Sequence, residues 1–234
     1  MLQHDNIVIF SSPRTGTKLL AKILEDFGYH SFGEWYSLFS AYIENNKAIR
    51  RPTSALPDLS LSEIKYHKTV EHIKRFNLYK NTNKSVVTIW PDSLNEFPFI
   101  LYKYQSYHWA CIKRDPWQQM LSWYISSKNY NFDGLKESSP VTFKLDAFRK
   151  AYWDYYKNDE LQNWVLANMS STLIEFDELV TGTSTIFGKP YIVNSKDEHS
   201  NLEHLVENLD EVKIWFNAFD KKRLSGTDYF NDMR

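Results

Sequence analysis

The sequence predicts an α/β fold with a mainly parallel central sheet and helices on both of its faces. Short apolar runs, typical of strands buried on both faces, lie at residues 7–10, 86–90 and 109–112, and a further strand is expected at 172–176. Helical patterns with one apolar face alternate with these runs along the chain. The length of 234 residues predicts a single domain over residues 1–234.

The first apolar run leads through a short polar loop into a helix. Residues 11–18 are small, polar or cationic, and apolar residues from Leu19 to Phe27 recur at the spacing of one helix face. Gly28 suits the end of this helix. A helix N-terminus presents unpaired backbone N–H groups and the positive end of the helix dipole, so this stretch predicts an anion-binding loop.

Five consecutive residues of the loop fit this prediction. They are Arg14, Thr15, Gly16, Thr17 and Lys18. The glycine lets the backbone approach an anion closely, the two threonines add hydroxyl donors, and the two cations add positive charge. The alternative is an ordinary turn between a strand and a helix, with exposed cations.

The order of residues in the loop separates it from the Walker A loop of kinases and other NTPases. In that motif a glycine directly precedes the lysine, whereas here Thr17 lies between Gly16 and Lys18, and Ser11 takes the place of the first glycine. The order Pro-Arg-Thr-Gly-Thr at 13–17 instead resembles the sulfotransferase loop, Pro-(Lys/Arg)-(Ser/Thr)-Gly-Thr. In that family the loop holds the 5′-phosphosulfate of 3′-phosphoadenosine 5′-phosphosulfate (PAPS). The resemblance therefore implies PAPS as cofactor and 3′-phosphoadenosine 5′-phosphate (PAP) as product.

A second stretch resembles the other sulfotransferase signature, and together the two cover about the first 125 residues. Asp115 and Pro116 follow the apolar run 109–112 and suit the N-cap and first residue of a helix. In the family, an arginine at the end of this strand and a serine eight residues later hold the 3′-phosphate of the cofactor. Arg114 and Ser122 keep that spacing, so the resemblance implies that they hold the 3′-phosphate.

The resemblance also bears on the catalytic residues. Cytosolic sulfotransferases take their base from a strand ending Lys-Thr-His, but residues 88–90 read Thr-Ile-Trp. Some bacterial sulfotransferases of small carbohydrates use a glutamate just after the first helix, in a context that Gly-Glu-Trp-Tyr at 33–36 resembles. This implies that Glu34 takes the acceptor proton and Arg14 meets the leaving oxygen; the alternative for Glu34 is a surface carboxylate. His108 begins its strand, away from the carboxyl ends where such sheets bind ligands.

The rest of the chain carries weaker signals. Helices are expected at 38–49, 60–76, 146–168, 202–209 and 212–219. Two polar loops are expected at 48–60 and 126–141, and the second is long enough to cover an acceptor. The basic stretch 221–226 resembles, loosely, a segment that closes the 3′-phosphate site in several relatives; the alternative is a solvated terminus.

Composition excludes several other classes of function. A net charge of −1 and a pI near 6.7 argue against a general nucleic-acid or anionic-membrane surface. The single cysteine, Cys111, excludes an internal disulfide. No signal peptide and no apolar run of ~20 residues is visible, so a soluble, cytoplasmic protein is expected. No metal site is expected, because His67 and His72 lie five residues apart and do not share a helix face.

These patterns predict an enzyme that transfers a sulfuryl group from PAPS to a hydroxyl or amine of a small-molecule or saccharide acceptor. Trp35 and Tyr36 suit stacking on a sugar, although core packing explains them equally well. One alternative is a nucleotide kinase that uses ATP and Mg²⁺, which the order of the loop disfavours. The other is a non-catalytic module that binds PAP or a related nucleotide, which the sequence leaves open.

Overall fold

The computed structural model describes residues 4–35, 40–44, 47–51, 82–91, 93–94, 98–129, 139–182, 185–192 and 202–225, and for residues 34–51 it describes the backbone alone. The chain divides into two compact units. Unit 1 comprises Met1–Lys113 and Leu161–Val193, and unit 2 comprises Arg114–Glu160 and Asn194–Arg234. The single domain expected over residues 1–234 stays a prediction.

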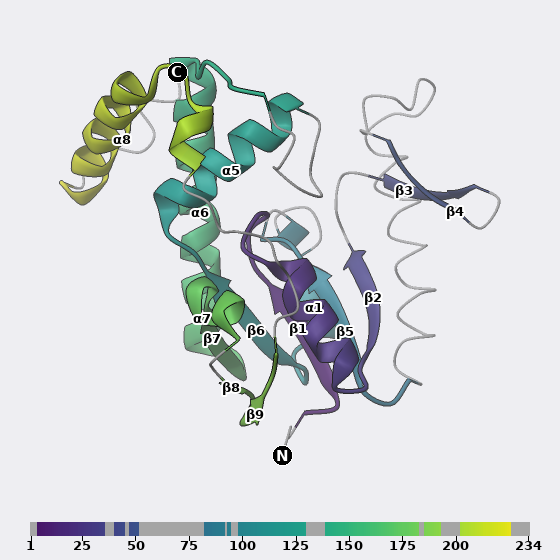
Figure 1. Ribbon diagram of the computed structural model, residues 1–234. Helices are drawn as coiled ribbons and strands as arrows, with labels where there is room; N and C mark the ends of the chain where they lie inside the picture. Colours follow the sequence, from purple (N-terminus) through teal and green to yellow (C-terminus); the bar gives the residue numbers. More distant parts are fainter. Residues whose placement is uncertain are drawn as a thin grey trace. The chain divides into compact units, whose positions relative to one another are not determined.

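Unit 1 contains a five-stranded sheet with helices on both faces, which confirms the expected α/β fold class (Figure 1). All neighbouring strands in it run parallel. In spatial order the strands are β2 (His30–Trp35), β5 (Ser85–Ile89), β1 (Asn6–Phe10), β6 (His108–Lys113) and β7 (Ser171–Glu175). The strand that leads into the predicted anion loop, β1, is therefore the central one.

The side chains of β1 alternate between two hydrophobic cores. Ile7 and Ile9 pack in one core with α1 (Thr17–Asp26) and α7 (Phe176–Thr181). Val8 and Phe10 pack in the other, with α4 (Phe99–Lys103) and the C-terminal part of α6 (Leu145–Asn168). Burial of both faces explains why β1, β5 and β6 are recognisable in the sequence as continuous apolar runs rather than alternating ones.

Unit 2 is built from helices around a separate core of its own. Its elements are α5 (Pro116–Asn129), the first part of α6, the 3₁₀ helix η2 (Leu202–Leu205) and α8 (Leu209–Leu224). Aromatic side chains dominate this core, among them Tyr124, Phe143, Phe148, Tyr152 and Phe219. No helix in the described part of the chain is long and apolar enough to cross a membrane.

The prediction of a helix at 38–49 is wrong. In its place β3 (Ser40–Glu44) and β4 (Lys47–Arg51) form an antiparallel pair, which also takes the first residues of the loop expected at 48–60. Short apolar stretches fit helical and strand periodicity equally well, so the pattern alone misleads here. The two asparagines between the strands in the sequence are the better signal, because Asn is typical of two-residue hairpin connections.

Other boundaries also differ from the expectation. The loop expected at 126–141 begins only after Asn129, where α5 ends, and its residues 130–138 lie outside the described residues. The helix expected at 202–209 is the shorter η2, and α8 takes in most of the basic stretch 221–226. The helix expected at 60–76 lies outside the described residues. A two-stranded hairpin of β8 (Thr185–Ile186) and β9 (Lys189–Pro190) completes the described elements of unit 1.

Candidate anion-binding site

The connections of the sheet mark a site at the carboxyl ends of β1 and β6. The chain leaves β1 through α1, which packs on one face of the sheet, and enters β7 from α6, which packs on the opposite face (Figure 1). Ligands of open parallel sheets bind where the connections change sides in this way. The pairing between β1 and β6 ends at Ile9 and Ala110, while β6 stays paired with β7 as far as Lys113. The two strands therefore part at the point where the predicted anion loop begins.

The loop itself has an unusual backbone. Arg14 has a φ of 70° and Gly16 a φ of 86°, so both lie in the left-handed region. For a residue with a side chain this conformation costs ~1–2 kcal/mol, so the surrounding structure must hold Arg14 in place. Non-glycine residues held in this way are concentrated at functional sites.

Hydrogen bonds of two hydroxyl groups help to fix the conformation of the loop. Ser11 is fully buried, and its Oγ donates to the carbonyl of Ile112 at 2.6 Å. The same Oγ lies 2.7 Å from Oγ1 of Thr15, which donates to the carbonyl of Ser12 at 2.8 Å. The loop is thereby tied both to itself and to the end of β6.

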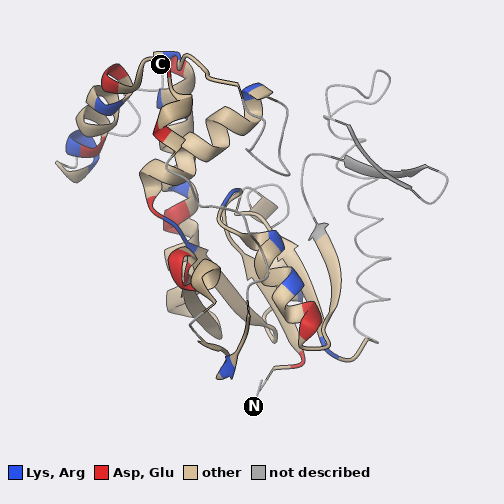
Figure 2. Ribbon diagram, viewed as in Figure 1, with Lys and Arg blue, Asp and Glu red and all other residues tan. Residues whose placement is uncertain are grey.

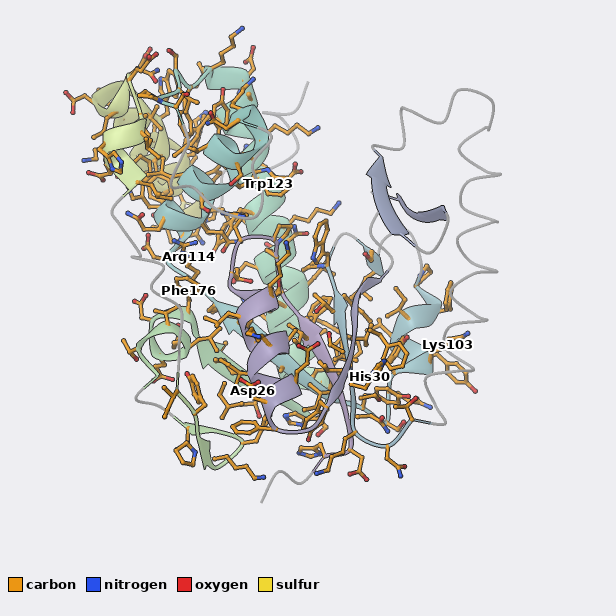
Figure 3. The ribbon with its side chains drawn as sticks, turned by 45° about the vertical axis from the view of Figure 1, so that its right-hand side comes forward. Asp26, His30, Lys103, Arg114, Trp123 and Phe176 are labelled. Carbon is orange, nitrogen blue, oxygen red and sulfur yellow. The ribbon has the colours of Figure 1, made fainter. Side chains whose placement is uncertain are left out.

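Gly16 leaves no room for a side chain. A Cβ at this position would lie 3.0 Å from Cε2 of Phe176 and 3.1 Å from Cδ2 of Leu179, both in α7. Figure 3 shows Phe176 beside the N-terminal end of α1. The sequence suggests that a glycine is needed at position 16 so that an anion can approach the backbone. The structure adds a second reason, because side chains of α7 fill the space that a Cβ would take.

The charged residues at the two ends of α1 have the signs that interact unfavourably with the helix dipole. Gly16 is the N-cap and makes no side-chain capping hydrogen bond, and the first turn contains Lys18 but no acidic residue. The acidic residues Glu25 and Asp26 lie at the other end (Figures 2 and 3). Helices are stabilised by the opposite arrangement, so the first turn of α1 places a cation at the end of the dipole that attracts anions.

Glu34 lies on the same edge of the sheet as the loop. In the register its backbone pairs with Thr88 of β5, which in turn pairs with Ile9 of β1. Two strand spacings put the backbones of β2 and β1 about 10 Å apart at this level. The sequence did not predict β2, because Gly33 interrupts the alternation of side chains that is typical of a strand. In the structure Gly33 has a φ of 74°, and the register with β5 shifts between Ser31 and Glu34.

The two residues expected at the 3′-phosphate belong to unit 2. Arg114 directly follows β6 in the chain, and Ser122 is buried on α5. Asp115 accepts a hydrogen bond at its Oδ1 from the backbone N–H of Gln118 at 2.9 Å, so the predicted N-cap of α5 is confirmed. The assignment of Arg114 and Ser122 to a 3′-phosphate stays a prediction.

His108 begins β6, as the sequence predicts, at the edge of the sheet opposite to the loop. Its ring nitrogens lie 3.0 Å from Oγ of Ser170 and 2.8 Å from Oγ1 of Thr172, and its ring stacks on His4 at 4.0 Å. Burial, and secondly the neighbouring His4, lower the pKa of His108 from 6.5 to about 4. A neutral, buried imidazole with both nitrogens engaged at this edge has a structural role.

Four residues to which the sequence pattern assigned no role support the loop: Ser11, Phe176, Leu179 and Gln162, whose Nε2 donates to the carbonyl of Ile112 at 2.9 Å. The available signal was Ser11, the first polar residue after a buried strand. The other three lie more than 100 residues along the chain, so no local pattern connects them with the loop.

This arrangement can bind a phosphate or sulfate group through backbone N–H groups, the Thr17 hydroxyl and two cations, Arg14 and Lys18. The described residues include no group of three or more His, Cys, Asp or Glu that could hold a metal ion. No protein-family model matches the chain, and no curated protein matches it significantly.

Proposed function

We propose that this chain is a PAPS-dependent sulfotransferase, which transfers a sulfuryl group to a hydroxyl or amine of a small-molecule or saccharide acceptor. The observation that carries the proposal is the loop at residues 11–18. Its order resembles the sulfotransferase loop, and it joins the central strand of a parallel sheet to a helix whose N-terminus lacks a side-chain cap. Its two left-handed residues, Arg14 and Gly16, fit a backbone that curves around an anion.

The loop would hold the 5′-phosphosulfate. Backbone N–H groups from Thr15 to Lys18 and the hydroxyl of Thr17 would bind the 5′-phosphate. As the bond between sulfur and the bridging oxygen breaks, negative charge grows on the phosphate that leaves as PAP. Arg14 would neutralise that charge, which is largest in the transition state, and so contribute to rate more than to binding.

Glu34 would take the proton of the acceptor as its oxygen or nitrogen bonds to sulfur. Its support is its place on the carboxyl edge of the sheet, level with Ile9 in the register. General-base help contributes ~10²–10⁴-fold, so Glu34→Gln should cut turnover about a hundredfold or more while PAP affinity stays unchanged. Glu25→Gln, the same substitution at the far end of α1, serves as the control. Near-normal turnover of Glu34→Gln on a true acceptor would make Glu34 structural.

The experiment that tests the function is a comparison of nucleotide affinities by calorimetry. Because Arg114 and Ser122 are assigned to a 3′-phosphate, PAP should bind at least about tenfold more tightly than adenosine 5′-phosphate. Equal affinities would overturn the proposal, and tighter binding of ATP with Mg²⁺ would favour the nucleotide kinase. PAP binding without turnover of labelled PAPS, over a screen of sugars, phenols and amines, would instead indicate a non-catalytic module.

A further inference from the structure

We infer that the hydroxyl groups of Ser11 and Thr15 act as a latch that positions the loop and that, unlike the Thr17 hydroxyl of the proposed function, they do not contact the anion. This inference rests on the proposed function for the identity of the ligand, PAP. It divides the roles of two threonines that the sequence treats alike. Gln162 of α6 belongs to the same latch, because it donates to the carbonyl that Ser11 also contacts.

The carbonyl of Ile112 explains why the latch exists. The pairing between β1 and β6 ends at Ile9 and Ala110, so the carbonyl of Ile112 lies beyond the last ladder contact with β1. A buried carbonyl without partners is costly, and it has two lone pairs to satisfy. The hydroxyl of Ser11 and the side-chain amide of Gln162 meet it at 2.6 Å and 2.9 Å, and both donors are almost completely buried.

The hydroxyl of Thr15 makes its hydrogen bonds within the loop. Thr15 is 1% exposed, and its Oγ1 contacts both the Ser11 hydroxyl and the Ser12 carbonyl. A threonine hydroxyl has a single proton to donate, and both acceptors that it contacts, the Ser12 carbonyl and the Ser11 hydroxyl, lie inside the loop. Thr15 can therefore offer an anion its backbone N–H but not its hydroxyl. Thr17, in the first turn of α1, takes no part in these contacts.

The latch also holds the conformation of Arg14. The hydrogen bond from Thr15 to Ser12 closes a turn around Arg14, whose φ of 70° is unfavourable for a residue with a side chain. Without the bond Arg14 can relax to a negative φ, which redirects its side chain. Ser11 and Thr15 are thus positioning residues, which act on the ligand through the backbone of the loop and through Arg14.

The test compares two buried serines near opposite edges of the sheet, Ser11 directly after β1 and Ser85 at the start of β5. Ser11→Ala removes a hydroxyl at the carboxyl edge, and Ser85→Ala removes one at the amino edge, where Oγ of Ser85 donates to Asn6. Both variants lose a buried hydrogen bond and should lower the urea midpoint similarly. Only Ser11→Ala should weaken PAP binding, by about tenfold, and speed amide exchange of residues 14–17 by a similar factor.

Variants of the two threonines distinguish positioning of the loop from contact with the anion. Thr15→Val keeps the shape but lacks the hydroxyl, so it should speed exchange in the loop and weaken PAP binding, and Thr15→Ser should restore both. Thr17→Val should weaken PAP binding with exchange in the loop unchanged.

Two results would overturn the latch. One is equal behaviour of Ser11→Ala and Ser85→Ala in exchange of residues 14–17. The other is loss of PAP binding in Thr15→Val with normal exchange, which would place the Thr15 hydroxyl on the anion. If the unmodified chain fails to bind PAP, the proposed function fails, and the exchange measurement still decides the latch.

Discussion

At the scale of single residues, Gly16 meets two separate constraints. Its φ of 86° is one that residues with side chains rarely adopt, and α7 fills the space where a Cβ would go. Gly28 shares the first constraint, with a φ of 87°, but a Cβ there would meet nothing within 4 Å. The two glycines therefore allow backbone strain and crowding to be measured separately.

We expect Gly28→Ala to lower the free energy of unfolding by ~1–2 kcal/mol, which is the cost of a left-handed alanine. Gly16→Ala should cost at least about 1 kcal/mol more, because Phe176 and Leu179 must move, and it should also weaken PAP binding. Urea unfolding and calorimetry measure the two effects. Equal losses of stability would mean that α7 yields to a methyl group.

His108 makes a second residue-scale prediction, on pH. Burial and the adjacent His4 lower its pKa to about 4, whereas an unfolded histidine titrates near 6.5. Between these values the unfolded chain binds the extra proton and the folded chain does not, so stability falls as pH drops through this window. From pH 8 to pH 5 the contribution of His108 should fall by about 2 kcal/mol.

Urea unfolding of the unmodified chain and of His108→Gln at both pH values isolates this contribution from the other histidines. The variant should lose less stability on acidification than the unmodified chain, by about the same 2 kcal/mol. Parallel losses in the two proteins would show that His108 is protonated in the fold as readily as outside it.

At the scale of elements, α1 carries its charges in an order that lowers its own stability. Lys18 lies in its first turn and its acids, Glu25 and Asp26, in the last turn, each at the end of the dipole that disfavours it. A helix selected for stability alone would have the reverse order. Proteins keep such unfavourable local choices mainly at functional sites.

Reversing the charge at either end of α1 separates the two properties. Lys18→Glu and Asp26→Lys should each raise the free energy of unfolding by ~0.3–1 kcal/mol, because both changes complement the dipole. Lys18→Glu should strongly weaken PAP binding, while Asp26→Lys, at the far end of the helix, should leave it unchanged. Retained PAP affinity in Lys18→Glu would contradict an anion site at this helix end.

At the scale of the whole molecule, the described residues of unit 1 form two cores, one on each face of the sheet, and those of unit 2 form a third. The single cysteine lies in unit 1. Cys111 is fully buried in the core formed with Val8 and Phe10, and burial raises the pKa of its thiol to about 12. The thiolate is the reactive form, so a thiol reagent should modify Cys111 only when this core opens. Labelling of Cys111 therefore reports the stability of the sheet.

A ligand that binds only the folded chain should slow this labelling. PAP at a hundred times its dissociation constant should slow labelling about a hundredfold when opening and closing are fast. Adenosine 5′-phosphate at the same concentration should slow it less. Labelling of the chain in urea, with and without PAP, controls for effects on the reagent. Unchanged labelling of the native chain would contradict PAP binding, and the measurement needs no acceptor.

Much of the fold was predictable because its signals are local. The apolar runs predicted β1, β5, β6 and β7 to within one residue at each end. Helix periodicity likewise predicted α1, α6 and α8. Burial of a strand on both faces, or of a helix on one, leaves its pattern within a few consecutive residues. The loop between β1 and α1 could be located for the same reason, because its residues are consecutive in the sequence, while its binding of an anion stays a prediction.

The tertiary structure decided what depends on residues far apart in the sequence. The hydroxyl of Ser11 contacts a carbonyl 101 residues away, and α7 requires Gly16 to be a glycine. The register across β5 sets the level of Glu34 relative to β1, and the pairing of β3 with β4 replaces an expected helix. A residue's own sequence neighbours determine its propensity, but its hydrogen-bond partners and the space around it are set by chain segments that only folding brings together.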